Sequence, residues 1–322
     1  MNRNSVLFVA AAVLVAGGAP GGLAQKYPVK PVRMISPFAP GGGTDILARG
    51  IATPLSESFG QPVVVDNRPG AGGMTGAETV ARSTPDGYTI IIVASTYAST
   101  SAYGNPPYDP VTGIQPVILI GTTGLVLTVH PSVQAKSTKE LIDHLRANPG
   151  KLSYASVGAG SVPHLAQELF KLETKTSMVH VPYKGAGPGL IALIGGEVQV
   201  TTISMVPILP HIKAGRLRAL ATTHARRAPL MPDLPTIGET VPGFEVIHWY
   251  GIWGPRGMPA TVVARLNGEI ARILATEEMK ARAKSEGLDT AGGPPEELGA
   301  VIKRDVEKWR RVIKEAKIGR EG

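Results

Sequence analysis

The residues in this sequence that are best suited to chemistry are glycines and hydroxyl residues gathered in short loops. The clearest loop, residues 37–45, reads Pro-Phe-Ala-Pro-Gly-Gly-Gly-Thr-Asp and precedes apolar residues at a four-residue spacing, Leu47, Ile51 and Leu55. That spacing predicts a helix, which Thr44 can cap. The glycines allow several backbone N–H groups to point out of the loop at the positive end of the helix dipole. We therefore expect the loop to bind an anion.

The common nucleotide-binding loops do not match this stretch. A Walker loop has Lys and then Ser or Thr after its last glycine, whereas Thr44 and Asp45 follow Gly43. The dinucleotide fingerprint has a later glycine that is missing here. The alternative interpretation is that the glycines only form the turn, and this one motif leaves both interpretations open.

Three more loops of small residues follow predicted strands, at 94–100, 158–161 and 182–189. Open parallel sheets bind ligands at the carboxyl ends of their strands, so we expect the four loops to meet at one cleft. Asp45 and Lys184 are the exceptional charges in these loops. An anion would then be held mainly by neutral N–H and hydroxyl donors, without a buried ion pair.

The same loops also allow a catalytic interpretation. Ser161 and His164 lie three residues apart on a predicted helix and could act as nucleophile and base, with Glu168 as the third member. A histidine in such a place is more often part of a pocket wall. Lys184 could form a Schiff base, but a loop lysine is more often a hydrogen-bond donor. The seven histidines show no metal-binding spacing and there is no cysteine, so we predict no metal, no cofactor and no enzymatic activity.

Strands alternate with helices along most of the chain, which predicts an α/β fold with mainly parallel sheets flanked by helices. One series of elements precedes residue 123 and a second begins near Leu125. The apolar segments 117–129 and 244–253 are predicted to cross between two lobes. The expected organisation is a first lobe formed by 25–123 plus 250–322 and a second lobe formed by 124–249.

The composition and the first residues point to an exported protein. The chain has 322 residues, which suggests about two domains, and a formal charge of +8. This charge favours acidic partners, but the low aromatic content and the scattered basic residues argue against nucleic acid. Arg3, the apolar run 6–16 and the small residues at 22–24 predict a signal peptide, residues 1–24, cleaved after Ala24. The mature protein should be periplasmic, without a membrane anchor.

The chain resembles the tripartite tricarboxylate transporter substrate-binding proteins, the Bug family. The resemblance rests on motifs that follow one another along essentially the whole mature chain: Tyr-Pro-Val-Lys-Pro-Val-Arg (27–33) with the loop 37–45, Asn-Arg-Pro-Gly-Ala-Gly-Gly (67–73), Pro-Asp-Gly-Tyr (85–88), Gly-Ala-Gly-Ser (158–161) with His-Leu (164–165), Val-Pro-Tyr-Lys-Gly (181–185) and Pro-His-Ile-Lys-Ala-Gly (210–215). It implies a monomeric, two-lobed Venus-flytrap protein of the periplasmic-binding-protein type. Such a protein clamps a small carboxylate and delivers it to a membrane permease.

The resemblance also implies a set of ligand-binding residues. The first lobe would hold one end of the ligand with Phe38, Gly43, Thr44 and Asp45, flanked by Ser95 and Thr96, and the second lobe would contribute Gly160, Ser161, His164, Tyr183, Lys184 and Gly185. Where the family commonly has an Asp-Asn pair, this chain has Ile203 and Ser204. Loss of the acid predicts a carboxylate without an amino group. The alternatives are a ligand sensor for a signalling receptor and a hydrolase that uses Ser161 and His164.

Overall fold

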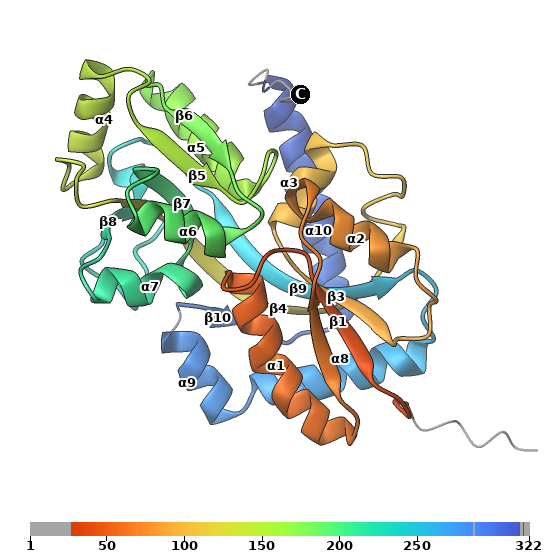
Figure 1. Cartoon of the computed structure of the whole chain (residues 1–322). Coiled ribbons are helices and arrows are strands. Elements are labelled where there is room, and N and C mark those ends of the chain that lie inside the picture. Colours follow the sequence, from red (N-terminus) through yellow and green to blue (C-terminus); the bar gives the residue numbers. More distant parts are fainter. Residues whose placement is uncertain (1–26, 286, 316–317, 319–322) are drawn as a thin grey trace, which may run out of the picture.

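The computed structural model describes residues 27–285, 287–315 and 318 (Figure 1). The predicted signal peptide, residues 1–24, lies outside these residues. One ten-stranded mixed sheet with the strand order β2-β1-β3-β9-β4-β7-β5-β6 runs through both lobes, and β8 and β10 pair with β4. Helices flank the sheet, so the predicted α/β class is confirmed. None of the described helices is both long enough and apolar enough to span a membrane.

The first lobe is built on three parallel strands, as their continuous apolar sequences predict. These strands and the helices between them are β1 (Val32–Ser36), α1 (Gly43–Phe59), β2 (Val63–Asn67), η1 (Ala71–Gly73), α2 (Met74–Ala81), β3 (Thr89–Ala94) and α3 (Thr96–Tyr103). The carboxyl ends of β1 and β3 lead into α1 and α3. The starts of both helices therefore lie at one edge of the sheet.

The second lobe repeats this pattern. Its elements are α4 (Thr138–Ala147), β5 (Ser153–Ser156), α5 (Val162–Thr174), β6 (Val179–Pro182), α6 (Ala186–Ile194), β7 (Val200–Ser204), α7 (Met205–Lys213), β8 (Arg218–Thr222) and η2 (Ile237–Glu239). β5 lies parallel to both β6 and β7. The helix starts at Val162, Ala186 and Met205 follow the carboxyl ends of these strands.

Two long strands connect the lobes. β4 (Ile114–Val129) pairs antiparallel with β9 (Ile247–Pro255) along its first part and with β7 and β8 along its last part. These strands contain most of the two segments that were predicted to cross between lobes, and Figure 1 shows them running between the two halves. The exact residue boundaries of the lobes stay a prediction.

The C-terminal segment covers the sheet and also bridges the lobes. It contains α8 (Ala260–Leu274), α9 (Glu277–Ser285), the short β10 (Asp289–Thr290) and α10 (Pro295–Glu315). Leu298, Ile302 and Val306 of α10 pack in a first-lobe core cluster with Trp253. Trp309, one turn further, packs in the second-lobe cluster with Phe170. Helix α10 therefore contributes to the cores of both lobes. The pattern of charged and apolar residues in its sequence did not predict this double contact.

The prediction of a hydroxyl-rich loop at residues 94–100 is wrong, because most of this segment forms the helix α3. Ser95 precedes the helix, and the side-chain hydroxyls of Ser99 and Thr100 donate to the backbone carbonyl of Thr96. Hydroxyl residues usually compete with helical hydrogen bonds. Here their hydroxyls bond back within the helix, and the buried α3 gains its stability from packing against α10.

Candidate functional site

The glycine loop between β1 and α1 forms the first wall of the site. Gly42, not Thr44, is the N-cap residue of α1, and Thr44 lies inside the first turn. The first helical hydrogen bond runs from the Ile46 N–H to the Gly42 carbonyl. Among the described residues, the N–H groups of Gly43, Thr44 and Asp45 have no acceptor. The start of α1 therefore offers unpaired donors at the positive end of its dipole.

Asp45 holds this loop in shape. Its carboxylate accepts hydrogen bonds from Gly41 N at 3.0 Å, Asn67 Nδ2 at 2.9 Å and Arg49 Nε at 3.1 Å. Burial raises the pKa of Asp45, but hydrogen bonds from Arg49, Asn67 and Gly41 outweigh burial, so its pKa is lowered. The negative charge of Asp45 is thus already balanced by Arg49 on α1 and by the N–H donors of Gly41 and Asn67. Asp45 supports the site from behind and does not line it.

A cavity of about 30 Å³ lies at the start of α1, between the two lobes. Its walls are Phe38, Gly42, Gly43, Thr44, Ala94, Thr96, Val157, Pro163, Ala186, Ile203, Ser204, His248 and Tyr250. None of these described wall residues carries a formal charge when the histidine is neutral. The cavity can therefore hold an anion only through dipoles, N–H groups and hydroxyls.

A contact between the lobes forms the base of the cavity. Tyr250 Oη on β9 donates to Ser204 Oγ at the end of β7, at 2.7 Å. Gly43 lies directly against this pair, because a Cβ atom on Gly43 would be 2.1 Å from Tyr250 Oη. Only glycine leaves room here for the start of α1 to approach the two hydroxyls.

His248 is a wall residue that the sequence analysis missed. Its Nδ1 lies 2.6 Å from Ser95 Oγ, and the exposed fractions of the two residues are 5% and 1%. Burial lowers the pKa of His248 to about 3, so its ring is neutral at pH 7. The sequence did hold a signal for this residue. His248 and Tyr250 are two residues apart on an apolar strand, and alternate residues of a strand point to the same face, so both side chains face the cavity.

The structure separates the predicted ligand-binding residues into two groups. Phe38, Gly43, Thr44, Thr96 and Ser204 line the cavity, and Ser95 contacts its wall through His248. The other predicted residues do not line it in the described structure: Asp45, Gly160, Ser161, His164, Tyr183, Lys184 and Gly185. Most of the second-lobe residues that were predicted to touch the ligand lie outside this lining, and their contact with a ligand stays a prediction.

Residues 183–185 belong to the rim where the lobes meet. The Lys184 carbonyl accepts a hydrogen bond from Ala39 N across the cleft at 3.0 Å. Gly185 faces the same backbone, because a Cβ atom there would lie 3.1 Å from Ala39 N. Lys184 therefore joins the lobes through its backbone, while its side chain is exposed.

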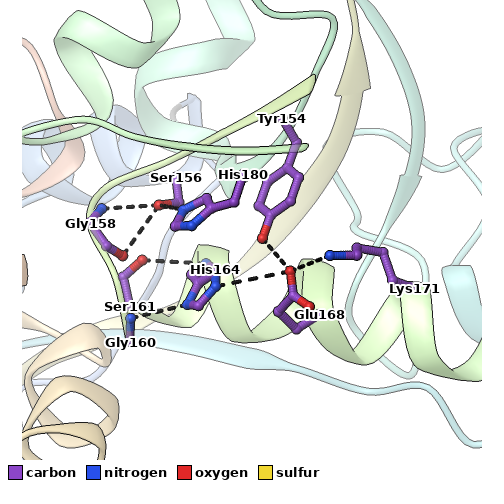
Figure 2. A network of polar contacts seen from close by, with 9 residues as sticks. All are labelled: Tyr154, Ser156, Gly158, Gly160, Ser161, His164, Glu168, Lys171 and His180. Carbon is purple, nitrogen blue, oxygen red and sulfur yellow. Dashed lines mark hydrogen bonds and ion pairs between the residues drawn. The ribbon is translucent and has the colours of Figure 1, made fainter. Parts of the chain in front are cut away.

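Ser161 and His164 belong to a polar network inside the second lobe (Figure 2). Ser161 Oγ caps α5 by accepting from the His164 backbone N–H at 3.3 Å. His164 Nδ1 accepts from Gly160 N at 3.1 Å, and its ring stacks on His180 with centroids 4.1 Å apart. Ser161 and His164 have exposed fractions of 0% and 1%. They are buried among structural partners and do not face the cavity.

Glu168, the third member of the catalytic hypothesis, is also engaged. Its Oε1 accepts hydrogen bonds from Tyr154 Oη at 2.5 Å and from Lys171 Nζ at 2.6 Å (Figure 2). Burial raises the pKa of Glu168, but the hydrogen bonds from Lys171 and Tyr154 outweigh it and the pKa is lowered. The carboxylate stabilises α5 and β5 and is 4.0 Å from His164 Nε2.

We predict that Ser161→Ala lowers the free energy of unfolding by about 1 kcal/mol, because α5 loses its cap. It should not change the background rate of ester hydrolysis. Ser137→Ala is the matched control, since Ser137 caps α4 by accepting from Glu140 N at 3.2 Å. Urea unfolding and a p-nitrophenyl acetate assay measure both quantities. Hydrolysis by the wild type that is lost only in Ser161→Ala would support the hydrolase alternative.

Comparisons with known proteins agree with a solute receptor. Residues 47–318 match the family described as "Tripartite tricarboxylate transporter family receptor". Among curated relatives, BugT of Bordetella pertussis is 34% identical to this chain, and the alignment covers 98% of each chain. A protein from the tcbD-tcbE intergenic region of Pseudomonas sp. (strain P51) is 39% identical, and the alignment covers 91% of this chain and 88% of the relative.

Solved structures show the same similarity. The periplasmic binding protein BugD has a TM-score of 0.87 and 34% identity, covering 90% of this chain and 99% of BugD. An R. palustris protein with adipate has a TM-score of 0.87 and 37% identity, with 90% and 98% covered. MatC from Rhodopseudomonas palustris with bound malate has a TM-score of 0.85 and 30% identity, with 89% and 100% covered.

Proposed function

Because the chain belongs to the tripartite tricarboxylate transporter family of receptors, we propose that it captures a small carboxylate in the periplasm and delivers it to a membrane permease of the tripartite tricarboxylate type. The family and its solved members are solute receptors, not enzymes. The relatives with adipate and malate support a carboxylate as the ligand. The predicted signal peptide supports capture outside the cytoplasm.

The observation that carries the proposal is the start of α1 at the cavity. The N–H groups of Gly43 and Thr44 have no acceptor among the described residues and belong to wall residues. A carboxylate placed there would accept from these donors and gain from the helix dipole. Thr96 and Ser204 add hydroxyl donors around the same cavity, and Tyr250 orients Ser204 by donating to its Oγ.

Capture would proceed by closure of the two lobes around β4 and β9. An anion would first meet the glycine loop of the first lobe. The second lobe would then cover it and restore the Ala39 to Lys184 hydrogen bond and the Tyr250 to Ser204 hydrogen bond. The closed surface is what a permease would recognise, and the receptor acts as a monomer with no bond made or broken in the ligand.

The ligand is expected to lack an amino group. Ile203 and Ser204 both line the cavity, and no carboxylate side chain is among its described wall residues. An ammonium group would therefore be desolvated without a counter-charge, which is costly. Tight binding of aspartate or glutamate, without binding of simple carboxylates, would contradict this expectation.

A thermal-shift screen tests the proposed function. The mature chain is heated with carboxylates, amino acids and nucleotides, and bound ligand is recovered for mass spectrometry. A ligand at about 100 times its dissociation constant adds roughly 2.7 kcal/mol to the free energy of unfolding, which raises the melting temperature by several degrees. We expect a shift with a carboxylate that is recovered unchanged. No shift with any acid, or a chemically altered acid, would refute the receptor function.

A further inference from the structure

The short segment 157–163 connects the cavity to the polar network of the second lobe. It follows β5 and leads into α5, and its two ends, Val157 and Pro163, line the cavity. Between these ends runs the Gly-Ala-Gly-Ser sequence of residues 158–161, which lies outside the described lining. A shift of this glycine-rich stretch would therefore also move two wall residues of the cavity.

The same segment is one of the places where the two lobes meet. A Cβ atom on Gly158 would lie 3.0 Å from Gly72 Cα, and one on Gly160 would lie 2.5 Å from Tyr103 Cδ1. Tyr103 belongs to α3 of the first lobe, and its ring also meets the His164 ring edge-on, with centroids 6.3 Å apart. Gly158 and Gly160 have φ angles of 127° and 72°, which other residues rarely adopt. This close approach therefore depends on one particular backbone conformation of the segment.

Two histidines fix that conformation from inside the second lobe (Figure 2). His164 Nδ1 accepts from Gly160 N at 3.1 Å. His180 Nε2 lies 2.6 Å from Ser156 Oγ, which accepts from Gly158 N at 3.1 Å. The two imidazole rings stack on each other with centroids 4.1 Å apart. The N–H groups of both glycines that meet the first lobe are thus held by this pair of rings, directly or through one hydroxyl.

From these contacts we propose that His164, stacked on His180, is a positioning residue for ligand capture. The inference rests on the proposed function, because it concerns closure over the ligand in that same cavity. His164 acts through the segment 157–163 and not by contact with the ligand. It places Val157 and Pro163 over the cavity and brings the glycines between them against the first lobe.

The rate of ligand release distinguishes this role from a purely structural one. The ligand first meets the glycine loop of the first lobe, and the segment 157–163 reaches it only on closure. A misplaced segment therefore speeds release from the closed protein and leaves the association rate nearly unchanged. A variant that merely destabilises the second lobe lowers the fraction of protein that binds, but each folded molecule releases its ligand at the wild-type rate.

Stopped-flow tryptophan fluorescence measures both rates. The ligands are adipate and malate, which solved relatives contain, and any carboxylate that the thermal-shift screen identifies. His164→Leu should release the ligand about tenfold faster, as expected for the loss of one hydrogen bond in the closed state. His164→Asn should stay within about threefold of the wild-type rate, because its amide oxygen can accept from Gly160 N.

Two further variants separate positioning from stability. Phe170→Leu is the control, because Phe170 is buried on the same helix in the second-lobe core against Phe244. It should lower the free energy of unfolding and keep the wild-type release rate. Tyr103→Leu removes the ring that meets His164 from the first lobe, so it tests the contact even where His164→Leu does not fold. It should speed release about threefold, as expected for the loss of one aromatic pair.

Three results would overturn the inference: a wild-type release rate in both His164→Leu and Tyr103→Leu, equally fast release from His164→Asn and His164→Leu, or release from Phe170→Leu that is as fast as from His164→Leu. Each of them leaves the proposed function intact, provided that the wild type binds a carboxylate. A wild type that binds none of the acids refutes the proposed function and the positioning role with it.

Discussion

Replacing Gly43 by alanine is expected to weaken carboxylate binding at least 100-fold while the protein stays folded. The added Cβ would lie 2.1 Å from Tyr250 Oη and 3.0 Å from Ser204 Oγ. Either Tyr250 moves and its hydrogen bond to Ser204 breaks, or the start of α1 moves away from the cavity. Both outcomes separate the helix donors from the hydroxyls that complete the site. A 100-fold loss corresponds to about 2.7 kcal/mol of binding free energy.

Titration calorimetry with the acid identified in the screen measures this loss. Gly268→Ala is the matched control, because Gly268 lies on α8 with nothing within 4 Å of an added Cβ. It should leave affinity unchanged and stabilise the helix by up to about 1 kcal/mol. Adding Tyr250→Phe to Gly43→Ala removes the closest clash and should restore part of the affinity. Wild-type affinity in Gly43→Ala would show that α1 does not hold the ligand.

The sequence was sufficient to predict the fold class and the first wall of the cavity because both depend on local patterns. The glycines at 41–43 and the apolar spacing after them specify a strand, a tight turn and a helix start. Gly42 became the N-cap instead of Thr44, since glycine is also acceptable there and the loop is held by Asp45. Asp45 was predicted to contact the ligand; its carboxylate accepts from Gly41 N in the loop, and the ligand contact stays a prediction.

The opposite side of the cavity could not be predicted in the same way, because β9 reaches it from far along the chain. His248 and Tyr250 lie on a strand that was predicted to cross between the lobes, and β9 also pairs with both β3 and β4 near the middle of the sheet. Strand order depends on non-local pairing, for which local periodicity gives no signal. In the glycine and hydroxyl loop at 158–161, Ser161 serves as the cap of α5, and the contact of this loop with the ligand stays a prediction.

Contacts at the cleft show why the glycines are distributed over both lobes. A Cβ atom on Gly72 would lie 3.2 Å from the Ala159 carbonyl oxygen, and one on Gly187 would lie 2.2 Å from the Pro40 carbonyl oxygen. Backbone therefore meets backbone where the lobes touch. Small residues at these places let the lobes close without interdigitating side chains, which is compatible with repeated opening and closing.

Acid should destabilise the protein through His248, and His248→Asn should remove that effect. Burial lowers the pKa of His248 to about 3 in the folded state, against 6.5 as its ordinary value. Above pH 6.5 the ring is neutral in both states and has no effect on the pH dependence. Between pH 6.5 and pH 3 the unfolded chain takes up a proton that the folded protein does not, so stability falls with falling pH.

The full loss in the free energy of unfolding from this one residue is roughly 4–5 kcal/mol at pH 3, and about half of it should appear by pH 5.

In His248→Asn the amide oxygen can take the place of Nδ1 beside Ser95, so the variant should fold and its free energy of unfolding should depend less on pH. Urea unfolding from pH 7 to pH 4 gives the difference between the two proteins. His130→Asn, at a solvent-accessible position beside Ser132, is the control and should follow the wild-type profile closely. Parallel profiles for His248→Asn and the wild type would mean that His248 accepts a proton in the folded cavity, and the neutral wall inferred for the ligand site would have to be abandoned.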